Sequence, residues 1–385
     1  MNILHISYHT SPLTSLGRND GGGMSTYVHE LCNVLSKSNE VTVITSDDSE
    51  SDKKNDYCNL VYSKLDQNTE IKTKVNNLDS FYKEYVHSDI NDASIDVEVV
   101  HAHYWLSGIL AKRLKQDFSI PFVYSSHSYG LFVGMNKSTK FRIEQEREVM
   151  LSADVIIASS DFELKFISDN YGIDKSKIKI IYPGVNSKIF FPDISFTTSN
   201  VKKILCVGRI QEQKGQHKVV EFMSFLSGLG INFHVYFVGE PSGEKGSLYF
   251  DELKELIIQN NYSESVTFLG SLNQEQLGQE LRSTDLLLHA AEFESFGLVA
   301  VEANACGTPV LTLNDGSLRE IVRDNINGLF TENFNNNDKL NNFINTVLLD
   351  KEKASLIRES SYESTEKYSW DKTGVNTISI YEKLA

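Results

Sequence analysis

The chain has few cysteines, a deficit of basic residues and no long apolar run. Its four cysteines are scattered and form no Cys-x-x-Cys pair, which argues against a zinc site or a redox motif. Cys206 lies in the apolar run 204–207 and is expected to be a buried thiol. With 37 basic and 52 acidic residues, the net charge is -15. Such a surface repels nucleic acid and anionic membranes, so we expect neither as a partner.

No apolar run approaches the roughly 20 residues needed to span a bilayer, so integral membrane contact is not expected. Residues 1–7 predict a short strand rather than a signal peptide, and the expected location is the cytoplasm. The apolar content of 40% and the charged content of 23% are typical of a globular protein. A length of 385 residues favours two domains over one.

Short apolar, β-branched runs alternate with longer amphipathic segments. Because the runs are continuously apolar, they predict strands that are buried on both faces, as in a parallel sheet. The segment 26–35 has helical spacing that places Tyr27, Leu31 and Leu35 on one face. This βαβ rhythm favours a doubly wound sheet. The strands expected in the first half are 3–7, 41–45, 97–101, 122–126, 155–159 and 178–182.

The rhythm breaks at 182–192, which holds two prolines and a glycine, and then restarts. The sequence therefore predicts an α/β protein with two Rossmann-like, doubly wound parallel-sheet domains facing a cleft. We place the domains at 1–188 and 189–368, and expect 369–385 to form a helix that packs back on the first domain. The strands expected in the second domain are 203–207, 233–238, 266–269, 286–289 and 310–313.

A glycine-rich segment, Gly21-Gly22-Gly23-Met24, follows the first strand and opens a helix. Glycines let a ligand approach the backbone, and a helix N-terminus offers N–H groups to phosphate. The alternative is a flexible surface loop, because the segment is neither G-x-G-x-x-G nor a Walker loop. Its position after the first strand favours ligand binding.

A second loop, 207–215, follows the first strand of the second domain and carries Arg209 and Lys214. Two cations at the end of a strand could neutralise a leaving diphosphate. The alternative is a pair of solvated surface charges. The glycines beside both residues and the place at a strand end favour the functional interpretation.

The segment 291–309 holds two glutamates, Glu294 and Glu302. We expect 295–298 to begin a helix, with Glu302 about two turns along it. One carboxylate would then suit a sugar hydroxyl and the other a ribose. The alternative is acid enriched near a helix N-terminus for its dipole, which would account for Glu294 but not for Glu302 in an otherwise apolar helix.

Histidines follow two first-domain strands. His127 lies in Ser-Ser-His-Ser-Tyr-Gly at the expected cleft mouth, where structural and functional roles are about equally favoured. His101 and His103 place both rings on one face of an extended segment, as in some metal sites. The sequence offers no third ligand near them, and nothing supports Asp47-Asp48 as a cation site. We therefore predict no metal.

Together these motifs resemble the retaining glycosyltransferases of family 4, which have the GT-B fold, along nearly the whole chain. In that family the two glutamates of the E-x7-E element contact the donor sugar and the ribose, which the resemblance assigns to Glu294 and Glu302. Arg209 and Lys214 match the pair that holds the diphosphate, and His127 matches a histidine near the reacting sugar carbon. The other donor-binding residues that the resemblance implies are Gly22, Gly23, Gly239, Ser295, Phe296, Gly297, Leu298 and Val299.

A narrower resemblance links 5–13, 20–24, 101–108 and 238–243 to the mycothiol-pathway N-acetylglucosaminyltransferases, and more distantly to sucrose-phosphate synthases. It implies UDP-N-acetylglucosamine and an inositol phosphate as substrates, with the first domain binding the acceptor and the second the nucleotide sugar. The acceptor-binding residues that it implies are Met24, Ser25, Tyr104, Ser128 and Arg142. Ser25 stands where those enzymes have asparagine, and their acceptor-phosphate lysine has two candidate counterparts, Lys72 and Lys74. Arg142 could instead form a salt bridge with Glu144 or Glu146.

The function implied is a retaining, metal-independent transfer of a hexose or N-acetylhexosamine from a nucleotide-diphosphate sugar to a small, phosphorylated acceptor. UDP-N-acetylglucosamine and UDP-glucose are the favoured donors, and the donor is a substrate, so no cofactor is expected. The catalytic residues would be His127, Arg209, Lys214 and Glu294. A nucleotide-sugar epimerase and a non-catalytic sugar-nucleotide sensor stay open as alternatives, and so does a homodimer.

Overall fold

The computed structural model divides the chain into two compact units. The first is formed by Met1–Thr14, Gly23–Pro183 and Trp370–Ala385, and the second by Ser15–Gly22 and Gly184–Ser369. Gly21, Asp47, Asp48 and Cys58 lie outside the described residues. Those that the structure describes are 1–12, 22–46, 59–63, 71–91, 96–133, 137–193, 195–196, 199–313, 316–334 and 337–385.

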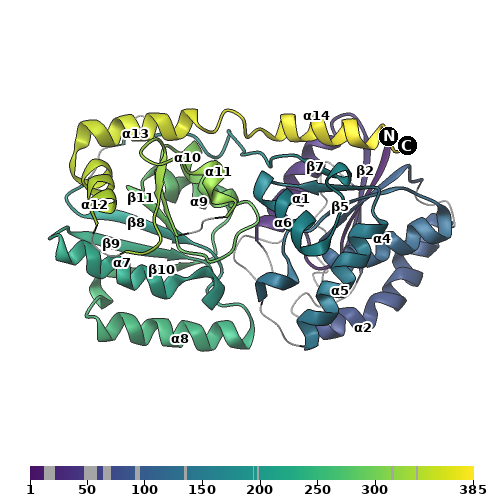
Figure 1. Ribbon diagram of the computed structural model, residues 1–385, viewed down its shortest axis with the longest axis horizontal. Helices are drawn as coiled ribbons and strands as arrows, with labels where there is room; N and C mark the ends of the chain where they lie inside the picture. Colours follow the sequence, from purple (N-terminus) through teal and green to yellow (C-terminus); the bar gives the residue numbers. More distant parts are fainter. Residues whose placement is uncertain are drawn as a thin grey trace. The chain divides into compact units, whose positions relative to one another are not determined.

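The first unit has a seven-stranded parallel sheet in the order β3-β2-β1-β4-β5-β6-β7. Figure 1 labels its strands β2, β5 and β7. The order reverses between β1 and β4, which makes a topological switch point at their carboxyl ends. The strands are β1 (Asn2–Ser7), β2 (Glu40–Ser46), β3 (Asn59–Ser63), β4 (Val99–His103), β5 (Phe122–Ser125), β6 (Val155–Ala158) and β7 (Ile178–Ile180). The α-helices are α1 (Gly23–Leu35), α2 (Ile71–Phe81), α3 (Ser88–Asn91), α4 (Tyr104–Phe118), α5 (Lys137–Ser152), α6 (Asp161–Tyr171) and α14 (Trp370–Tyr381).

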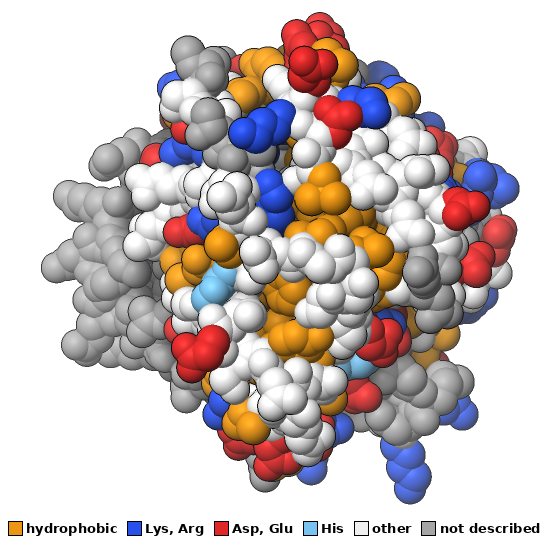
Figure 2. Space-filling model, turned by 90° about the vertical axis from the view of Figure 1, so that its left-hand side faces the viewer, with side chains coloured by type: hydrophobic (Ala, Val, Ile, Leu, Met, Phe, Trp, Pro, Cys, Tyr) orange, Lys and Arg blue, Asp and Glu red, His pale blue; other side chains and the backbone are white. Residues whose placement is uncertain are grey.

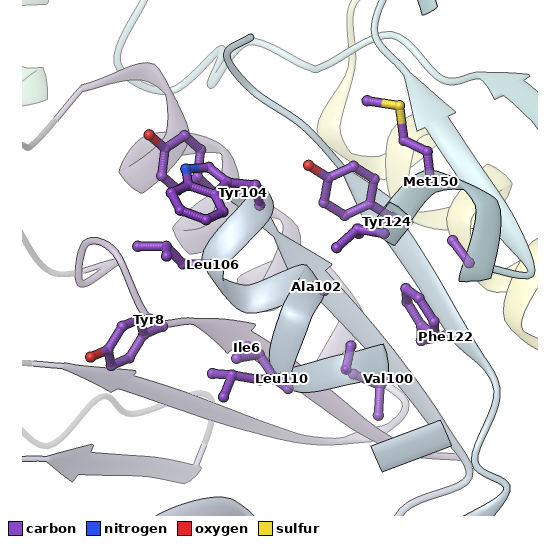
Figure 3. Close-up of a cluster of buried hydrophobic side chains, with 14 of the residues drawn as sticks. Ile6, Tyr8, Val100, Ala102, Tyr104, Leu106, Leu110, Phe122, Tyr124 and Met150 are labelled. Carbon is purple, nitrogen blue, oxygen red and sulfur yellow. The ribbon is translucent and has the colours of Figure 1, made fainter. Parts of the chain in front are cut away.

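The core of the first unit forms where α4 packs on the sheet. All five residues of β4 are buried, including His101 and His103. Leu106 and Leu110, one turn apart on α4, lie over Ile6 of β1 and Val100 of β4 (Figure 3). Burial of each such side chain stabilises the fold by about 1.5–3 kcal/mol.

The second unit has a six-stranded parallel sheet in the order β10-β9-β8-β11-β12-β13, so its switch point lies between β8 and β11. The strands are β8 (Lys202–Val207), β9 (Phe233–Val238), β10 (Val266–Gly270), β11 (Leu286–His289), β12 (Val310–Thr312) and β13 (Gly328–Phe330). The α-helices are α7 (Gln216–Gly228), α8 (Gly243–Gln259), α9 (Gln274–Arg282), α10 (Leu298–Ala305), α11 (Leu318–Ile321), α12 (Asp338–Ile344) and α13 (Lys351–Glu363).

The predicted α/β class with two doubly wound parallel sheets is confirmed, with corrections to single elements. The edge strands β3 and β13 were not predicted, because neither carries a long apolar run. The strand β4 occupies Val99–His103 instead of 97–101, so His103 is its last residue. The helix α10 begins at Leu298 rather than at Ser295. Gly297 precedes it with a φ of 96°, a left-handed conformation that cannot continue into a helix turn.

The units divide after Pro183 rather than after residue 188. Just after the division, within the second unit, the Val185 N–H donates to the Tyr368 carbonyl at 3.3 Å. The helix α14 belongs to the first unit and packs against α1. Its Trp370 ring meets the Tyr27 ring edge-on at 5.6 Å, and Thr373 Oγ1 donates to the Tyr182 carbonyl at 2.8 Å.

The surface mixes charges of both signs. On the face drawn in Figure 2, acidic and basic side chains are interspersed around hydrophobic ones. Within the described part of the chain, none of the helices has the length and apolar character needed to cross a membrane.

Candidate active site

In the second unit, two loops meet at the carboxyl ends of β8 and β11. Arg209 follows β8, and Lys214 ends a short 3-10 helix, Glu212–Lys214. Lys214 Nζ donates to Glu294 Oε2 at 2.9 Å, and the Glu292 N–H donates to the Gln213 carbonyl at 3.2 Å. The structure thus brings Lys214 and Glu294, 80 residues apart, into one ion pair.

Glu294 is held as a carboxylate by its surroundings. Burial by itself would raise its pKa, but Lys214 and His289 outweigh it, and the pKa of Glu294 lies well below its ordinary value. His289 Nε2 lies 3.5 Å from Glu294 Oε2. Sequence reasoning did not single out His289, although its place as the last residue of β11 is the signal that could have found it.

Glycines allow the strand ends of the second unit to approach one another closely. Gly215 has a φ of 69°, and a Cβ there would lie 2.2 Å from the Ala290 carbonyl oxygen. Gly239 follows β9 with a φ of 130°, and a Cβ there would lie 2.2 Å from the Gly208 carbonyl oxygen. Any larger residue at either position would push the loops apart. Because Gly215 has no side chain, the loop that carries Lys214 can lie directly against the β11 loop.

The segment 294–302 leads from the ion pair into α10. Glu302 is 5% exposed and lies four positions after Leu298, so it is about one turn into the helix, not two. Phe296 is buried and meets the Tyr368 ring at 5.6 Å. Ser295, Leu298 and Val299 are half-buried. The first turn of any α-helix presents N–H groups that lack intrahelical acceptors, which suits an anion.

In the first unit, two bulky residues hold a strained backbone at strand ends. Tyr104 directly follows β4 with a φ of 75°, and His127 follows β5 with a φ of 58°. A left-handed conformation costs a non-glycine residue about 1–3 kcal/mol, and such residues cluster at functional sites. Tyr104 and His127, both predicted site residues, thus share a left-handed backbone that the sequence does not reveal.

Behind His127 lies a network of buried imidazoles. His127 Nε2 is 3.0 Å from His103 Nδ1, and His103 Nε2 is 2.9 Å from His5 Nδ1. His101 lies beside them, with Nδ1 2.6 Å from the Tyr381 hydroxyl and Nε2 2.9 Å from Ser125 Oγ. Burial lowers the pKa of His5 and of His127 to about 3. Burial and the neighbouring rings lower the pKa of His101 and His103 well below the ordinary value, so all four are neutral at pH 7.

The expectation that no third ligand lies near His101 and His103 is wrong, because β1 lies beside β4 and places His5 against both. The three rings lie close enough to hold a metal ion in principle. Both nitrogens of His101 and both of His103 instead face hydrogen-bond partners within the first unit.

The residues expected to bind the acceptor gather around Arg142 of α5. Arg142 Nε donates to Glu146 Oε1 at 2.7 Å, and Nη2 donates to Ser128 Oγ at 3.2 Å. Its guanidinium carbon lies 4.9 Å from the centre of the Tyr104 ring. Arg142 therefore forms a salt bridge, as the alternative interpretation expected, and its partner is Glu146 rather than Glu144. It coexists with contacts to both Ser128 and Tyr104.

A second cation reaches the same cluster. Lys74 is 1% exposed, and its Nζ donates to the His9 carbonyl at 2.9 Å. The His9 ring stacks on the Tyr104 ring at 4.5 Å. The Arg142 guanidinium lies over the same tyrosine ring, so Tyr104 contacts both His9 and Arg142. Lys72 lies exposed on α2. Of the two candidate lysines, only Lys74 contacts this cluster.

The glycine-rich turn leads into α1. Gly23 is the first residue of this helix, and a Cβ at Gly22 would meet open space. Met24 packs partly buried against the core. Ser25 is buried, with Oγ 3.1 Å from Thr10 Oγ1, so its hydroxyl ties α1 to the loop after β1.

Two family models match this chain. Glycosyltransferase Family 4 matches residues 21–188, and glycosyl transferases group 1 matches residues 188–364. The chain belongs to the family-4 glycosyltransferases. The two matches meet at residue 188, and the fold of two doubly wound sheets is the GT-B fold of that family. This glycosyltransferase transfers a sugar from a nucleotide sugar to an acceptor.

Curated relatives cover almost the whole glycosyltransferase. The D-inositol 3-phosphate glycosyltransferase of Mycolicibacterium smegmatis is 29% identical, over 98% of this chain and 90% of its own length. That of Corynebacterium urealyticum is 26% identical, over 100% and 96%.

Among solved structures, a sucrose-phosphate synthase from Thermosynechococcus elongatus superposes with a TM-score of 0.87 at 24% identity, covering 99% of this chain and 98% of that one. Anabaena HepE, solved with UDP and glucose, superposes with a TM-score of 0.78 at 18% identity, covering 99% of each chain. Because both sequence identities are below 25%, these two structures are evidence for the fold alone.

Proposed function

We propose that this glycosyltransferase transfers a hexose or N-acetylhexosamine, with retention and without a metal, to a hydroxyl of a phosphorylated cyclitol. UDP-N-acetylglucosamine and UDP-glucose are the donors that we favour. The observation that carries the proposal is the cluster of Lys74, His9, Tyr104, Arg142 and Ser128 at the switch point of the first sheet. The curated relatives that act on D-inositol 3-phosphate support the same acceptor class.

The chemistry of this cluster suits a phosphate monoester. Two cations flank one pair of stacked rings, and among the described residues the acid bonded to Arg142 is Glu146, which is itself fully buried. Glu146 also accepts from the Gly130 N–H and the Tyr171 hydroxyl, so its charge is shared among several donors. A guanidinium has five N–H donors, of which Glu146 and Ser128 use two. Bidentate guanidinium–phosphate pairing is among the stronger hydrogen-bond arrangements in proteins.

The donor half of the mechanism uses the second unit. Arg209 and Lys214 stabilise the negative charge on the departing diphosphate, and a donor phosphate oxygen takes the proton of the acceptor hydroxyl as it attacks from the same face. The lowered pKa of Glu294 keeps it ionised, which suits it to accept hydrogen bonds from sugar hydroxyls. Glu302 binds the ribose hydroxyls, and His127 contacts the sugar without acting as the base.

The test compares an inositol phosphate with unphosphorylated inositol as acceptor, with release of UDP from each donor as the readout. Wild type should prefer the phosphate strongly. Lys74→Met and Arg142→Met should each lose roughly tenfold to a hundredfold of that preference, since a charged hydrogen bond contributes about 1.5–3 kcal/mol.

Lys72→Met is the matched control, because Lys72 lies on the same helix as Lys74 but is exposed. It should keep the wild-type preference. The preference is a ratio between two acceptors, so a general loss of folded enzyme leaves it unchanged. Equal reaction of inositol and its phosphate would refute the acceptor assignment. Isomerised donor in an incubation without acceptor would instead reveal an epimerase, and binding without UDP release would reveal a sensor.

A further inference from the structure

Three imidazoles in the first unit form a row that ends at His127. They come from three neighbouring segments of the sheet: His5 from β1, His103 from the end of β4, and His127 from the loop after β5. The joining distances are 2.9 Å from His5 Nδ1 to His103 Nε2 and 3.0 Å from His103 Nδ1 to His127 Nε2. His5 and His103 have no exposed surface.

A row of neutral imidazoles has a direction. Each ring carries one N–H, so one nitrogen donates and the other accepts. Once one ring of the row is assigned, the hydrogens of the other two follow. Either all N–H groups point from His5 toward His127, or all point from His127 toward His5.

The direction is set at His5, where the row begins. His5 Nε2 is buried and has no hydrogen-bond partner among the residues that the structure describes. If the N–H groups pointed toward His5, this nitrogen would carry a hydrogen with no acceptor. Buried N–H groups without acceptors are rarer than buried acceptors without donors, because the lost hydration of the donor is not replaced. A hydrogen on His5 Nδ1 avoids that arrangement.

We propose that His5 and His103 are positioning residues that fix His127 in the tautomer with its hydrogen on Nδ1. His5 Nδ1–H donates to His103 Nε2, and His103 Nδ1–H donates to His127 Nε2. The Nε2 lone pair of His127 is then occupied, and the ring presents an N–H donor to its ligand. The ligand atom that it suits is an oxygen acceptor such as a sugar hydroxyl or a donor phosphate oxygen. This step rests on the proposed function, in which His127 contacts the donor sugar.

The packing around the row keeps the rings in place. The Tyr27 ring meets the His127 ring edge-on at 5.0 Å, and the His5 and His103 rings are nearly parallel, with an interplanar angle of 7°. His101 contacts both His5 and His103, but its nitrogens bond to Tyr381 and Ser125 instead. His101 therefore borders the row without belonging to it.

The test is nitrogen-15 NMR of the histidine side chains in the full chain without substrate, with the His127 signals assigned by their loss in His127→Gln. Wild type should show His127 as the neutral Nδ1–H tautomer. His103→Leu removes the donor to Nε2, so His127 should move to the Nε2–H tautomer or to a mixture. His103→Asn keeps a side-chain N–H in place of Nδ1–H and should restore the wild-type tautomer.

Ser125→Ala is the matched control, because it removes a bond to His101 within the same buried network and should leave the His127 tautomer unchanged. An Nε2–H tautomer in wild type would overturn the proposal, and this result needs no variant to fold. An unchanged Nδ1–H tautomer in His103→Leu would overturn it too.

Turnover provides a second readout. His103→Leu should lower kcat/KM about tenfold, and His103→Asn should recover most of it, since a single positioned hydrogen bond contributes roughly a factor of ten. The spectra need no substrate, so the two proposals fail separately. A correct tautomer in an enzyme that transfers no sugar would refute the function alone.

Discussion

The two units place their site residues at the same position of the same kind of sheet, but the side chains around Glu294 and those behind His127 differ in charge. In the second unit, Lys214 and Glu294 are charged, and their side chains are 29% and 19% exposed. In the first, the residues behind His127 are neutral imidazoles buried in the core. The sheet order sets where a ligand can bind. The side chains decide whether the site stabilises developing charge or holds a hydrogen bond in one orientation.

The largest expected difference between the units is their response to acid. The four histidines of the buried imidazole network have a lowered pKa when folded, to about 3 for His5 and His127, whereas an unfolded histidine titrates near 6.5. Their stabilising contribution is full above about pH 6.5 and falls as pH drops toward the folded pKa. Each should remove about 1.4 kcal/mol of unfolding free energy per pH unit, so the first unit should lose several kcal/mol by about pH 5.

The Lys214–Glu294 ion pair of the second unit loses its stabilising contribution over a different pH range. The folded pKa of Glu294 is lowered, so its contribution is present above the unfolded pKa of a glutamate and is lost only as pH falls through the lower folded value. Burial also lowers the pKa of His234, which adds a smaller slope in the same direction as in the first unit. Hydrogen exchange at neutral pH and at about pH 5 should show protection lost mainly in β1, β4 and β5. Equal loss in β8 and β11 would contradict the comparison.

The second prediction concerns charge at the donor loops. Lys214→Met and Arg209→Ala should each cost about 2 kcal/mol or more of transition-state stabilisation, roughly thirtyfold in kcat/KM, because each removes a cation from the diphosphate. Lys218→Met is the matched control. Lys218 pairs with Glu292 of the same β11 loop at 3.1 Å, and that partner is 52% exposed. The Lys218→Met variant should turn over nearly as fast as wild type. Wild-type turnover in Lys214→Met would refute the assignment of Lys214 to the diphosphate.

The same comparison explains what the sequence could predict. The donor-loop residues lie in short motifs whose glycines and charges can be read locally, and Gly215 and Gly239 are needed where two backbones meet. Strands such as β4, β5 and β11 were predictable because all of their residues are buried. The edge strand β13, Gly-Leu-Phe, begins with a glycine and carries too little apolar, β-branched pattern to be recognised.

The first-unit network depends on residues that are distant in sequence. His5 meets His103 across 98 residues, and Lys74 meets His9 across 65. A single buried histidine or lysine gives no local signal of its partner, and only the pairing of β1 with β4 brings the two histidines together. The left-handed backbone of Tyr104 is likewise invisible in the sequence, because nothing but the surrounding packing enforces it.

The smallest predicted effect tests the most distant contact of that network. Tyr381 of α14 is fully buried, and its hydroxyl lies 2.6 Å from His101 Nδ1, 280 residues away in sequence. Tyr381→Phe leaves this nitrogen without its partner, which should cost the first unit about 1–3 kcal/mol of unfolding free energy.

Hydrogen exchange in α1 and β4 should speed up in this variant, while exchange in the second unit stays as in wild type. Tyr362→Phe on α13 is the control, because that ring is 48% exposed and its change should stay within about 0.5 kcal/mol. If β4 were as protected from hydrogen exchange in Tyr381→Phe as in wild type, the C-terminal helix would stabilise the first unit only through its apolar packing on α1. The contrast between the units would then rest on the His5–His103–His127 row alone.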